Sequence, residues 1–185
     1  MPVKLFESEH FYMTTVYQTS LPEHLAVTTA WFADNPNLKR GVLEDSHLTT
    51  LNQYSRTEIK INQDFANRAD AQPFVQSIQQ SAKQFLNGPG RPFITGLWLN
   101  EMRTGEHHYP HHHLGCYYAG CYYVEVPEGA SGITFYDPVN QIIDPNVGDL
   151  LLWRGIHFHE VPKSNFLGTR RSIAFNIVIA PELEV

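Results

Sequence analysis

Histidines crowd into one segment of the chain, His107-His108-Tyr109-Pro110-His111-His112-His113. These seven residues hold five of the ten histidines in the sequence. A short apolar segment, residues 117–124, follows almost directly, and two more histidines, His157 and His159, lie at the end of another apolar segment. Because the neutral imidazole ring is a common metal ligand, this arrangement indicates that the three segments meet around one metal ion.

The spacing of these histidines suggests which of them bind. In an extended segment, His111 and His113 project from the same face with Cα atoms roughly 6–7 Å apart, whereas His112 and His108 point away. We expect the third ligand to be His159, although spacing alone leaves a rival set with His157 open. Three protein ligands leave positions open on a metal, which is typical of catalytic sites. The competing interpretation is a solvated histidine-rich loop, and we prefer it for His107, His108, His112 and His157.

The pattern around these histidines is that of a β-rich protein. Short β-type runs separated by turns are predicted at residues 93–102, 117–126, 133–136, 149–153, 158–161 and 172–180. Many short strands of this kind indicate a sandwich or jelly-roll barrel. Before residue 91 we expect an extended segment (3–18), loops and short strands (38–66), and two helices. One helix begins at Ser20, a possible N-cap, and ends near Phe32, and the other (71–86) carries an apolar stripe for core packing. We therefore predict one domain over residues 1–185, with 1–90 as helical or irregular support and 91–180 as a metal-binding core.

Composition excludes several classes of protein. The chain has 185 residues, 42% of them apolar and 17% charged, which is typical of a folded protein. Its net charge of −6 disfavours a nucleic-acid or anionic-membrane partner, and no apolar run approaches the roughly 20 residues of a membrane-spanning helix. Without an apolar signal region at the start, a cytoplasmic location is expected. Cys116 and Cys121 are predicted to be reduced, packed thiols that do not bridge.

A second group of residues suggests a site for a carboxylate. In the segment 169–176, strand alternation places Arg170, Ser172, Ala174 and Asn176 on one face and Arg171, Ile173 and Phe175 on the other. An arginine inside a barrel needs an anionic partner, and its planar fork matches a carboxylate. A serine two residues further on can donate to the same carboxylate. The spacing is equally consistent with two surface arginines beside a turn.

Five motifs, in order, give the sequence a recognisable resemblance. They are His111-X-His113, Ala119-Gly120-Cys121-Tyr122-Tyr123, Ser131-Gly132-Ile133-Thr134-Phe135-Tyr136-Asp137-Pro138, Gly148-Asp149-Leu150-Leu151-Leu152-Trp153 with His159-Glu160-Val161, and Arg170-Arg171-Ser172-Ile173-Ala174-Phe175-Asn176. Over about residues 96–178 the chain resembles the Fe(II)/2-oxoglutarate-dependent oxygenases of bacteria and phages, in the superfamily of the prolyl hydroxylases.

This resemblance implies a mostly β fold, a double-stranded β-helix (a cupin-like jelly roll) with flanking helices. It implies that Fe(II) is held by His111, His113 and His159, that Arg170 and Ser172 hold the distal carboxylate of 2-oxoglutarate, and that Tyr123 reaches the same carboxylate. Asn100 is a further candidate for contact with the cosubstrate. The implied activity is oxidation of a substrate by O₂, with release of succinate and CO₂. One departure stands out: His113 occupies a position where the wider superfamily has Asp or Glu.

Two other functions fit the same residues. The first is a cupin-like enzyme with a three-histidine metal site that does not use 2-oxoglutarate. The second is a non-catalytic jelly roll that binds metal loosely or not at all. The sequence does not identify the substrate, a small molecule or a peptide, and a homodimer is compatible with it. Tyrosines 109, 117, 118, 122 and 136 can line a pocket, but they are more simply ordinary strand residues.

Overall fold

The computed structural model describes residues 15–34, 55–59, 69–86, 88–136 and 140–182. The elements are, in chain order, β1 (Tyr17–Ser20), the 3-10 helix η1 (Pro22–His24), α1 (Leu25–Asp34), β2 (Ser55–Ile59), α3 (Gln72–Leu86), β3 (Arg91–Met102), β4 (His108–His111), β5 (Tyr118–Glu125), β6 (Ile133–Phe135), β7 (Gln141–Ile143), β8 (Asp149–Arg154), β9 (His159–Val161) and β10 (Arg170–Ala180). All strand pairs are antiparallel.

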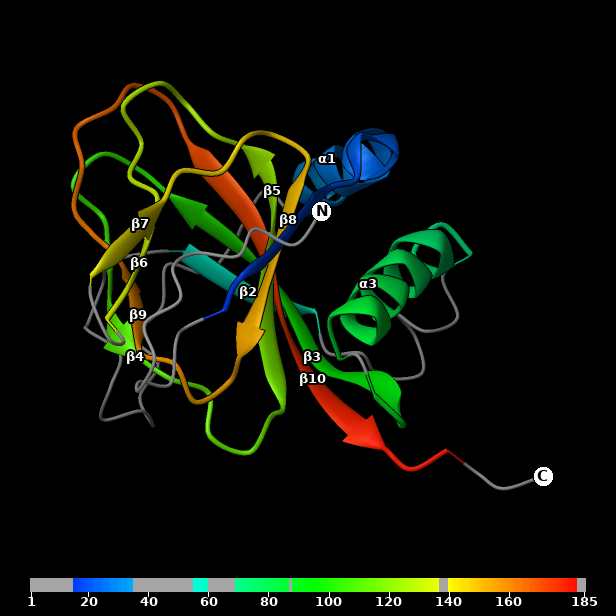
Figure 1. Ribbon diagram of the computed structural model, residues 1–185. Coiled ribbons are helices and arrows are strands. Elements are labelled where there is room, and N and C mark those ends of the chain that lie inside the picture. The colour runs from blue at the N-terminus through cyan, green and yellow to red at the C-terminus, as the bar shows by residue number, and fades with distance from the viewer. Residues whose placement is uncertain (1–14, 35–54, 60–68, 87, 137–139, 183–185) are drawn as a thin grey trace.

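The strands form two sheets. The larger has the order β1-β8-β5-β10-β3-β2 and the smaller the order β4-β9-β6-β7. The smaller sheet lies on one side of the larger one, and helices α1 and α3 cover the other side (Figure 1). From β3 to β10 the described strands alternate between the two sheets, apart from β6 and β7, which are neighbours in the smaller sheet; this is the arrangement of a double-stranded β-helix. The predicted fold class, mostly β with flanking helices, is confirmed.

The central strands of the larger sheet, β5 and β10, are buried on both faces. Their side chains alternate between two apolar clusters. Ile173, Phe175 and Ile177 of β10 belong to the cluster shared with the helices. Cys121 and Tyr123 of β5 belong to a second cluster, on the side of the smaller sheet. Because successive side chains point to opposite faces of a strand, one set packs against the helices and the other set faces the space between the two sheets.

Helix α3 holds the outer face of the larger sheet. Phe74, Ile78 and Ala82, at helical spacing, have no exposed surface and belong to the helix-side cluster. The ring of Phe74 packs edge-on against Tyr122 of β5, with 5.0 Å between centroids, and against Trp31 of α1, at 5.5 Å. The expected packing role of this apolar stripe is confirmed, because it is the surface that covers β5.

Several local predictions need correction. Ser20 is not a helix cap: it ends β1, and the first helical turn is a 3-10 helix whose N-cap, Leu21, makes no side-chain cap hydrogen bond. Pro22 at the start of that turn fixes its backbone instead. Cys116 and Cys121 are both unbridged, as expected. Cys116 lies in the loop before β5, and its Sγ contacts the carbonyl oxygen of His113 at 3.0 Å.

Part of what was predicted lies outside the described residues. This applies to residues 3–14 and to most of 38–66, in which only β2 is described. In the described part of the chain, no helix is both long enough and apolar enough to cross a bilayer. The cytoplasmic location, the single domain and the homodimer stay predictions.

We predict that Gly120→Ala destabilises the fold. A Cβ atom at Gly120 would lie 2.4 Å from the ring of Phe175 and 2.7 Å from Leu152, and both side chains are fully buried. Overpacking of this kind costs roughly 1–3 kcal/mol. Urea unfolding measures the loss. Gly96→Ala is the matched control, because the Cβ there meets nothing closer than 3.6 Å; equal stability losses in the two variants would contradict the packing described here.

Candidate metal centre

Three histidines converge between the two sheets. One ligand nitrogen from each of His111, His113 and His159 lies within 4.8 Å of the others, and among the described residues this is the group that can hold a metal ion. His111 ends β4 and stands opposite His159 of β9 in the strand register, with ring centroids 4.3 Å apart. His113 lies in the following loop, where its backbone N–H donates to the carbonyl of Gly155 at 2.7 Å. Two strands and one anchored loop therefore position the group.

Hydrogen bonds select the ring nitrogen that two of these histidines offer to a metal. Nδ1 of His159 lies 3.0 Å from the carbonyl oxygen of His157, and Nδ1 of His111 lies 2.8 Å from that of Tyr109. A carbonyl oxygen only accepts, so each Nδ1 carries the proton and donates it. The lone pair is then on Nε2, the arrangement commonly found in metal-bound histidines.

The environment of His159 keeps its ring neutral. The residue is 4% exposed, and burial lowers the pKa of His159 well below its usual value. The nearby rings of His111 and His113 lower the pKa further, because a positive charge on one ring opposes protonation of the others. The unprotonated form, which is the form that binds metals, is therefore the stable one at neutral pH.

The four expected cosubstrate residues line the same pocket as the three histidines. Asn100 on β3, Tyr123 on β5, and Arg170 and Ser172 on β10 all contribute to its wall. The strand register explains why: Ser172 pairs with Asn100 on one side and with Tyr123 on the other. Residues at matched positions of neighbouring strands point to the same face, so the three side chains lie in a row across the sheet.

The guanidinium group of Arg170 is buried without an anionic partner among the described residues. Arg170 is 3% exposed, and its Nε and Nη2 atoms have no hydrogen-bond partner. Its contacts with neutral groups include one with Sδ of Met102 at 3.6 Å and one with the ring of Tyr123 at 5.1 Å. The hydroxyl of Tyr123 is also buried and has no hydrogen-bond partner among the described residues. A buried unpaired charge is very unfavourable, so these donors fit a carboxylate ligand.

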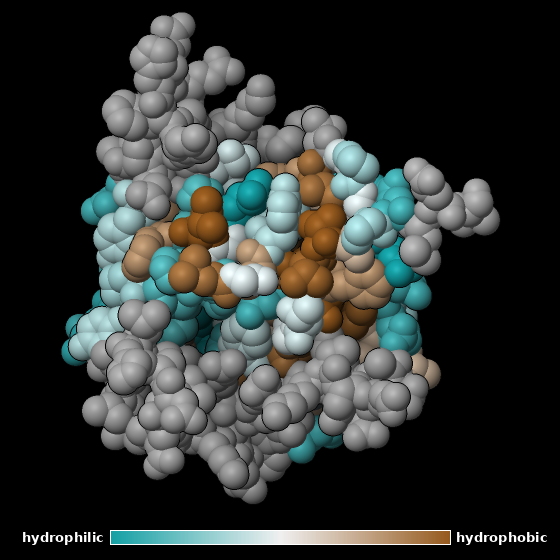
Figure 2. Space-filling view, turned by 90° about the horizontal axis from the view of Figure 1, so that it is seen from below, coloured by the Kyte–Doolittle hydropathy of each residue, from teal (hydrophilic) through white to brown (hydrophobic). Residues whose placement is uncertain are grey.

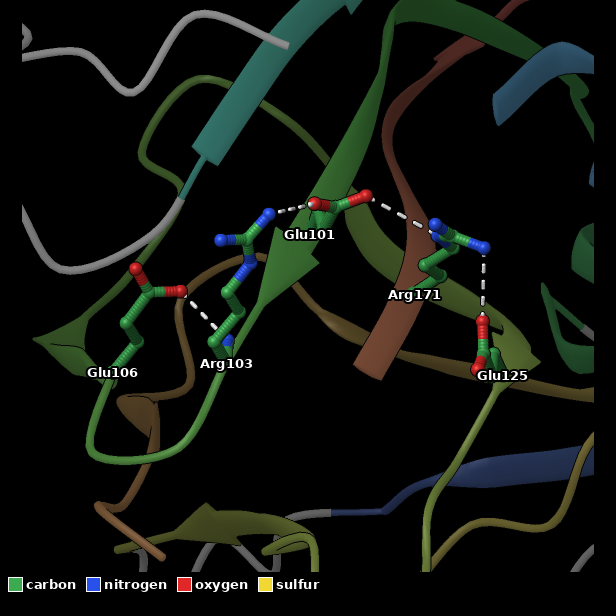
Figure 3. A network of polar contacts seen from close by, with 5 residues as sticks. All are labelled: Glu101, Arg103, Glu106, Glu125 and Arg171. Carbon is green, nitrogen blue, oxygen red and sulfur yellow. Dashed lines mark hydrogen bonds and ion pairs between the residues drawn. The ribbon is translucent and has the colours of Figure 1, made fainter. Parts of the chain in front are cut away.

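The next residue shows the opposite arrangement. Arg171 points to the other face of β10, where its guanidinium meets Glu101 of β3 at 3.2 Å and Glu125 of β5 at 3.0 Å (Figure 3). Arg103 also contacts Glu101, at 3.7 Å. The two arginines therefore have different roles in the structure. One is neutralised by the protein itself, and the other faces the pocket beside the histidines.

One of the expectations about individual residues was wrong. His108 does not point away: it lines the pocket, with its ring centroid 3.9 Å from that of His111, because a register shift between the two interrupts the alternation of β4. Tyr118 and Tyr122 face the helices, not the site, and Tyr118 stacks on Phe85. His157, the rival ligand, contributes its carbonyl oxygen to His159.

Two pocket residues carried no signal in the sequence analysis. Trp153 lines the pocket, its buried Nε1–H has no hydrogen-bond partner among the described residues, and its ring lies 4.8 Å from that of His159. Cys121 lines it beside Arg170, and burial raises the pKa of its thiol. Both read as ordinary strand residues in sequence. The alternation of side chains along a strand predicts that both face the pocket only once the pairing of the neighbouring strands is known.

Three histidines that can hold a metal inside a double-stranded β-helix, next to an arginine with no ionic partner among the described residues, are typical of one class of proteins. It is the class of the metal-dependent oxygenases that use 2-oxoglutarate. Residues 96–176 match the model of the family described as "Putative 2OG-Fe(II) oxygenase". The resemblance seen in the sequence is thereby confirmed. No curated protein matches the sequence.

Solved structures with low identity share the fold. A 2OG-Fe(II) oxygenase family oxidoreductase from Burkholderia pseudomallei is 11% identical, with a TM-score of 0.64, over 88% of this chain and 84% of that one. The viral collagen prolyl hydroxylase of Paramecium Bursaria Chlorella virus-1 is 13% identical, with a TM-score of 0.61, over 88% and 94%. A Trichoplax adhaerens prolyl hydroxylase is 15% identical, with a TM-score of 0.65, over 88% and 83%.

We predict that His159→Ala abolishes stoichiometric metal binding, because it removes the buried member of the group. The variant should bind Fe(II) or Co(II) at least about tenfold more weakly than the wild type. Metal content after anaerobic loading and desalting, measured by mass spectrometry, checks this. His112→Ala is the matched control, since the His112 ring packs against Phe158 and is outside the group. Full metal content in His159→Ala, or its loss in His112→Ala, would contradict the assignment.

Proposed function

We propose that this chain is a Fe(II)- and 2-oxoglutarate-dependent oxygenase in which His111, His113 and His159 hold the metal and Arg170 holds the far carboxylate of 2-oxoglutarate. The assignment of Arg170 rests on its guanidinium, which is buried in the wall of the histidine pocket and has no ionic partner among the described residues. Ser172, Tyr123 and Asn100 complete the proposed cosubstrate site. They share that wall, and Tyr123 has a hydroxyl group with no partner among the described residues.

The proposed roles follow from the chemistry of each side chain. When bound, Fe(II) supplies oxidation by O₂ coupled to conversion of 2-oxoglutarate into succinate and CO₂. Arg170 neutralises the carboxylate at the far end of the cosubstrate, and its planar fork fixes the orientation of that carboxylate. The Tyr123 hydroxyl can donate to the same carboxylate. The apolar residues of the pocket, including Trp98, Met102 and Ile133, limit the access of water.

The pocket favours this function over the two alternatives. A cupin-like enzyme that does not use 2-oxoglutarate has no need of an arginine buried in the metal pocket. A non-catalytic jelly roll has no need of three histidines with converging nitrogens. Both features occur together here, and the cost of burying Arg170 is explained when a dicarboxylate is the ligand.

We predict that Arg170→Ala weakens 2-oxoglutarate binding roughly 30-fold or more, the equivalent of ~2 kcal/mol for loss of a buried charge-assisted contact. Calorimetry on metal-loaded protein measures the affinity. Conversion of 2-oxoglutarate to succinate with Fe(II) and ascorbate, including uncoupled turnover, measures the activity. Arg171→Ala is the matched control, because it removes the neighbouring guanidinium from the opposite face. Equal effects of the two substitutions would remove Arg170 from its proposed role.

A second, smaller effect is expected at Tyr123. Tyr123→Phe deletes the unpartnered hydroxyl and should weaken 2-oxoglutarate binding about fivefold, near the ~1 kcal/mol of one hydrogen bond. Tyr122→Phe is its control. The Tyr122 hydroxyl donates to the carbonyl of Leu21 at 2.8 Å on the helix side, so this change should lower the free energy of unfolding and leave the cosubstrate affinity unaltered. Weaker 2-oxoglutarate binding by Tyr122→Phe, with unchanged binding by Tyr123→Phe, would place the cosubstrate elsewhere.

A further inference from the structure

Trp153 differs from the other aromatic residues of the metal pocket in that its indole N–H group is buried without a partner. The side chain is 3% exposed, and Nε1 has no hydrogen-bond acceptor among the described residues. An indole nitrogen only donates, and a buried donor that stays unpaired is unfavourable. Since Trp153 lines the pocket, its N–H group is suited to a ligand that brings an acceptor atom into the pocket.

The fold places the Trp153 ring beside the metal-binding histidines. Along β8, Leu152 packs on the helix side, whereas Leu151 and Trp153 face the smaller sheet. The Trp153 ring packs edge-on against that of His159, with 4.8 Å between centroids. Nδ1 of His159 donates to the carbonyl oxygen of His157, and its Nε2 is the nitrogen offered to the metal. The His159 ring therefore keeps no lone pair for Trp153 when a metal is bound.

Another tryptophan of the chain shows how a buried indole is normally satisfied. Trp31 has no exposed surface and packs on the helix side of the larger sheet. Its Nε1–H donates to Oδ2 of Asp70 at 3.1 Å. The protein thus supplies an acceptor for the indole that has a packing role, and the described residues supply none for the indole in the metal pocket.

The depth of Trp153 in the pocket indicates which ligand it meets. Trp153 and Arg170 are both 3% exposed, and their strands, β8 and β10, flank β5. In the loops next to the histidines, by contrast, Leu114 is 72% and Ile156 59% exposed. These loops, after β4 and β8, lie at the lower end of the molecule in Figure 1, and apolar side chains gather on the face seen from below in Figure 2. Exposed side chains of this kind suit a primary substrate, whereas the deeply buried donors suit the cosubstrate.

On the basis of the function proposed above, we propose that the Nε1–H group of Trp153 donates a hydrogen bond to the 2-oxo acid end of 2-oxoglutarate, the end that binds the metal. Arg170 takes the far carboxylate, so the two buried donors bind opposite ends of one molecule. Trp153 is then a cosubstrate-binding residue that favours ligands with an acceptor oxygen beside His159. The contact takes no coordination position on the metal, so the position that O₂ needs stays free.

The test uses full-length protein loaded with Zn(II), which is diamagnetic and supports no oxidation. Calorimetry first measures 2-oxoglutarate binding, and absence of binding overturns the proposed function itself. The sequence has three tryptophans, so protein labelled with ¹⁵N at the indole nitrogen gives three N–H resonances, each assigned by its loss in a Trp→Phe variant. On saturation with 2-oxoglutarate, we expect the Trp153 proton resonance to move downfield and the Trp31 resonance to stay in place. An unmoved Trp153 resonance at saturation would mean that water or another group is the acceptor, and it overturns the inference.

Two matched variants measure the contribution of the N–H group to affinity. Trp153→Phe removes the donor and retains an aromatic ring; it should weaken 2-oxoglutarate binding about tenfold, the loss of one hydrogen bond to a charged group, and keep the metal content of the wild type. Trp31→Phe removes a donor that the protein itself satisfies and should leave the affinity unchanged. Equal affinities of the wild type and Trp153→Phe, or an equal loss in both variants, overturn the inference. If Trp153→Phe does not fold, the NMR titration of the wild type decides alone.

Discussion

The buried guanidinium of Arg170 is the constraint on which the rest of the site depends. A charge at 3% exposure is tolerated only if something neutralises it, and the described part of the protein offers no carboxylate for that purpose. The stability of the folded chain and the binding of an acidic ligand are therefore linked. A ligand that binds the native state alone stabilises it by mass action, and here such a ligand would also relieve an unfavourable burial.

The same strands that carry the site also form the core, which explains how the pocket is held in place. In β10, Arg170 and Ser172 face the pocket while Ile173 and Phe175 pack against the helices. In β5, Tyr123 faces the pocket and Tyr122 packs on Phe74. A shift of any pocket residue would displace its neighbours in a close-packed interior. Functional groups on such rigid elements keep their geometry better than groups on loops. His113 lies in a loop, where a backbone hydrogen bond to Gly155 holds it in place.

Local patterns predicted much of this arrangement, and nonlocal pairing decided the remainder. Alternation in 170–176 placed Arg170 and Ser172 on one face, and the structure shows the same division. It left open whether the arginines were buried or on the surface, because the partners of Arg171, Glu101 and Glu125, lie on other strands. The register shift in β4 that turns His108 into the pocket spans Pro110, which has no N–H for a ladder hydrogen bond, and the sequence analysis did not use this signal. Short strands such as β7 were missed because three residues give no measurable periodicity.

The replacement of a carboxylate by His113 bears on the choice between functions. As a motif, His113 at this position weakens the likeness to the superfamily, since the usual set of two histidines and one carboxylate is incomplete. Judged by charge, it acts in the opposite direction: a metal with three neutral ligands attracts an anionic chelator more strongly, and Arg170 attracts the far end of the same molecule. A neutral substrate would satisfy neither group. The departure from the motif and the buried arginine thus select for the same kind of ligand, a dicarboxylate with one end at the metal and the other at β10.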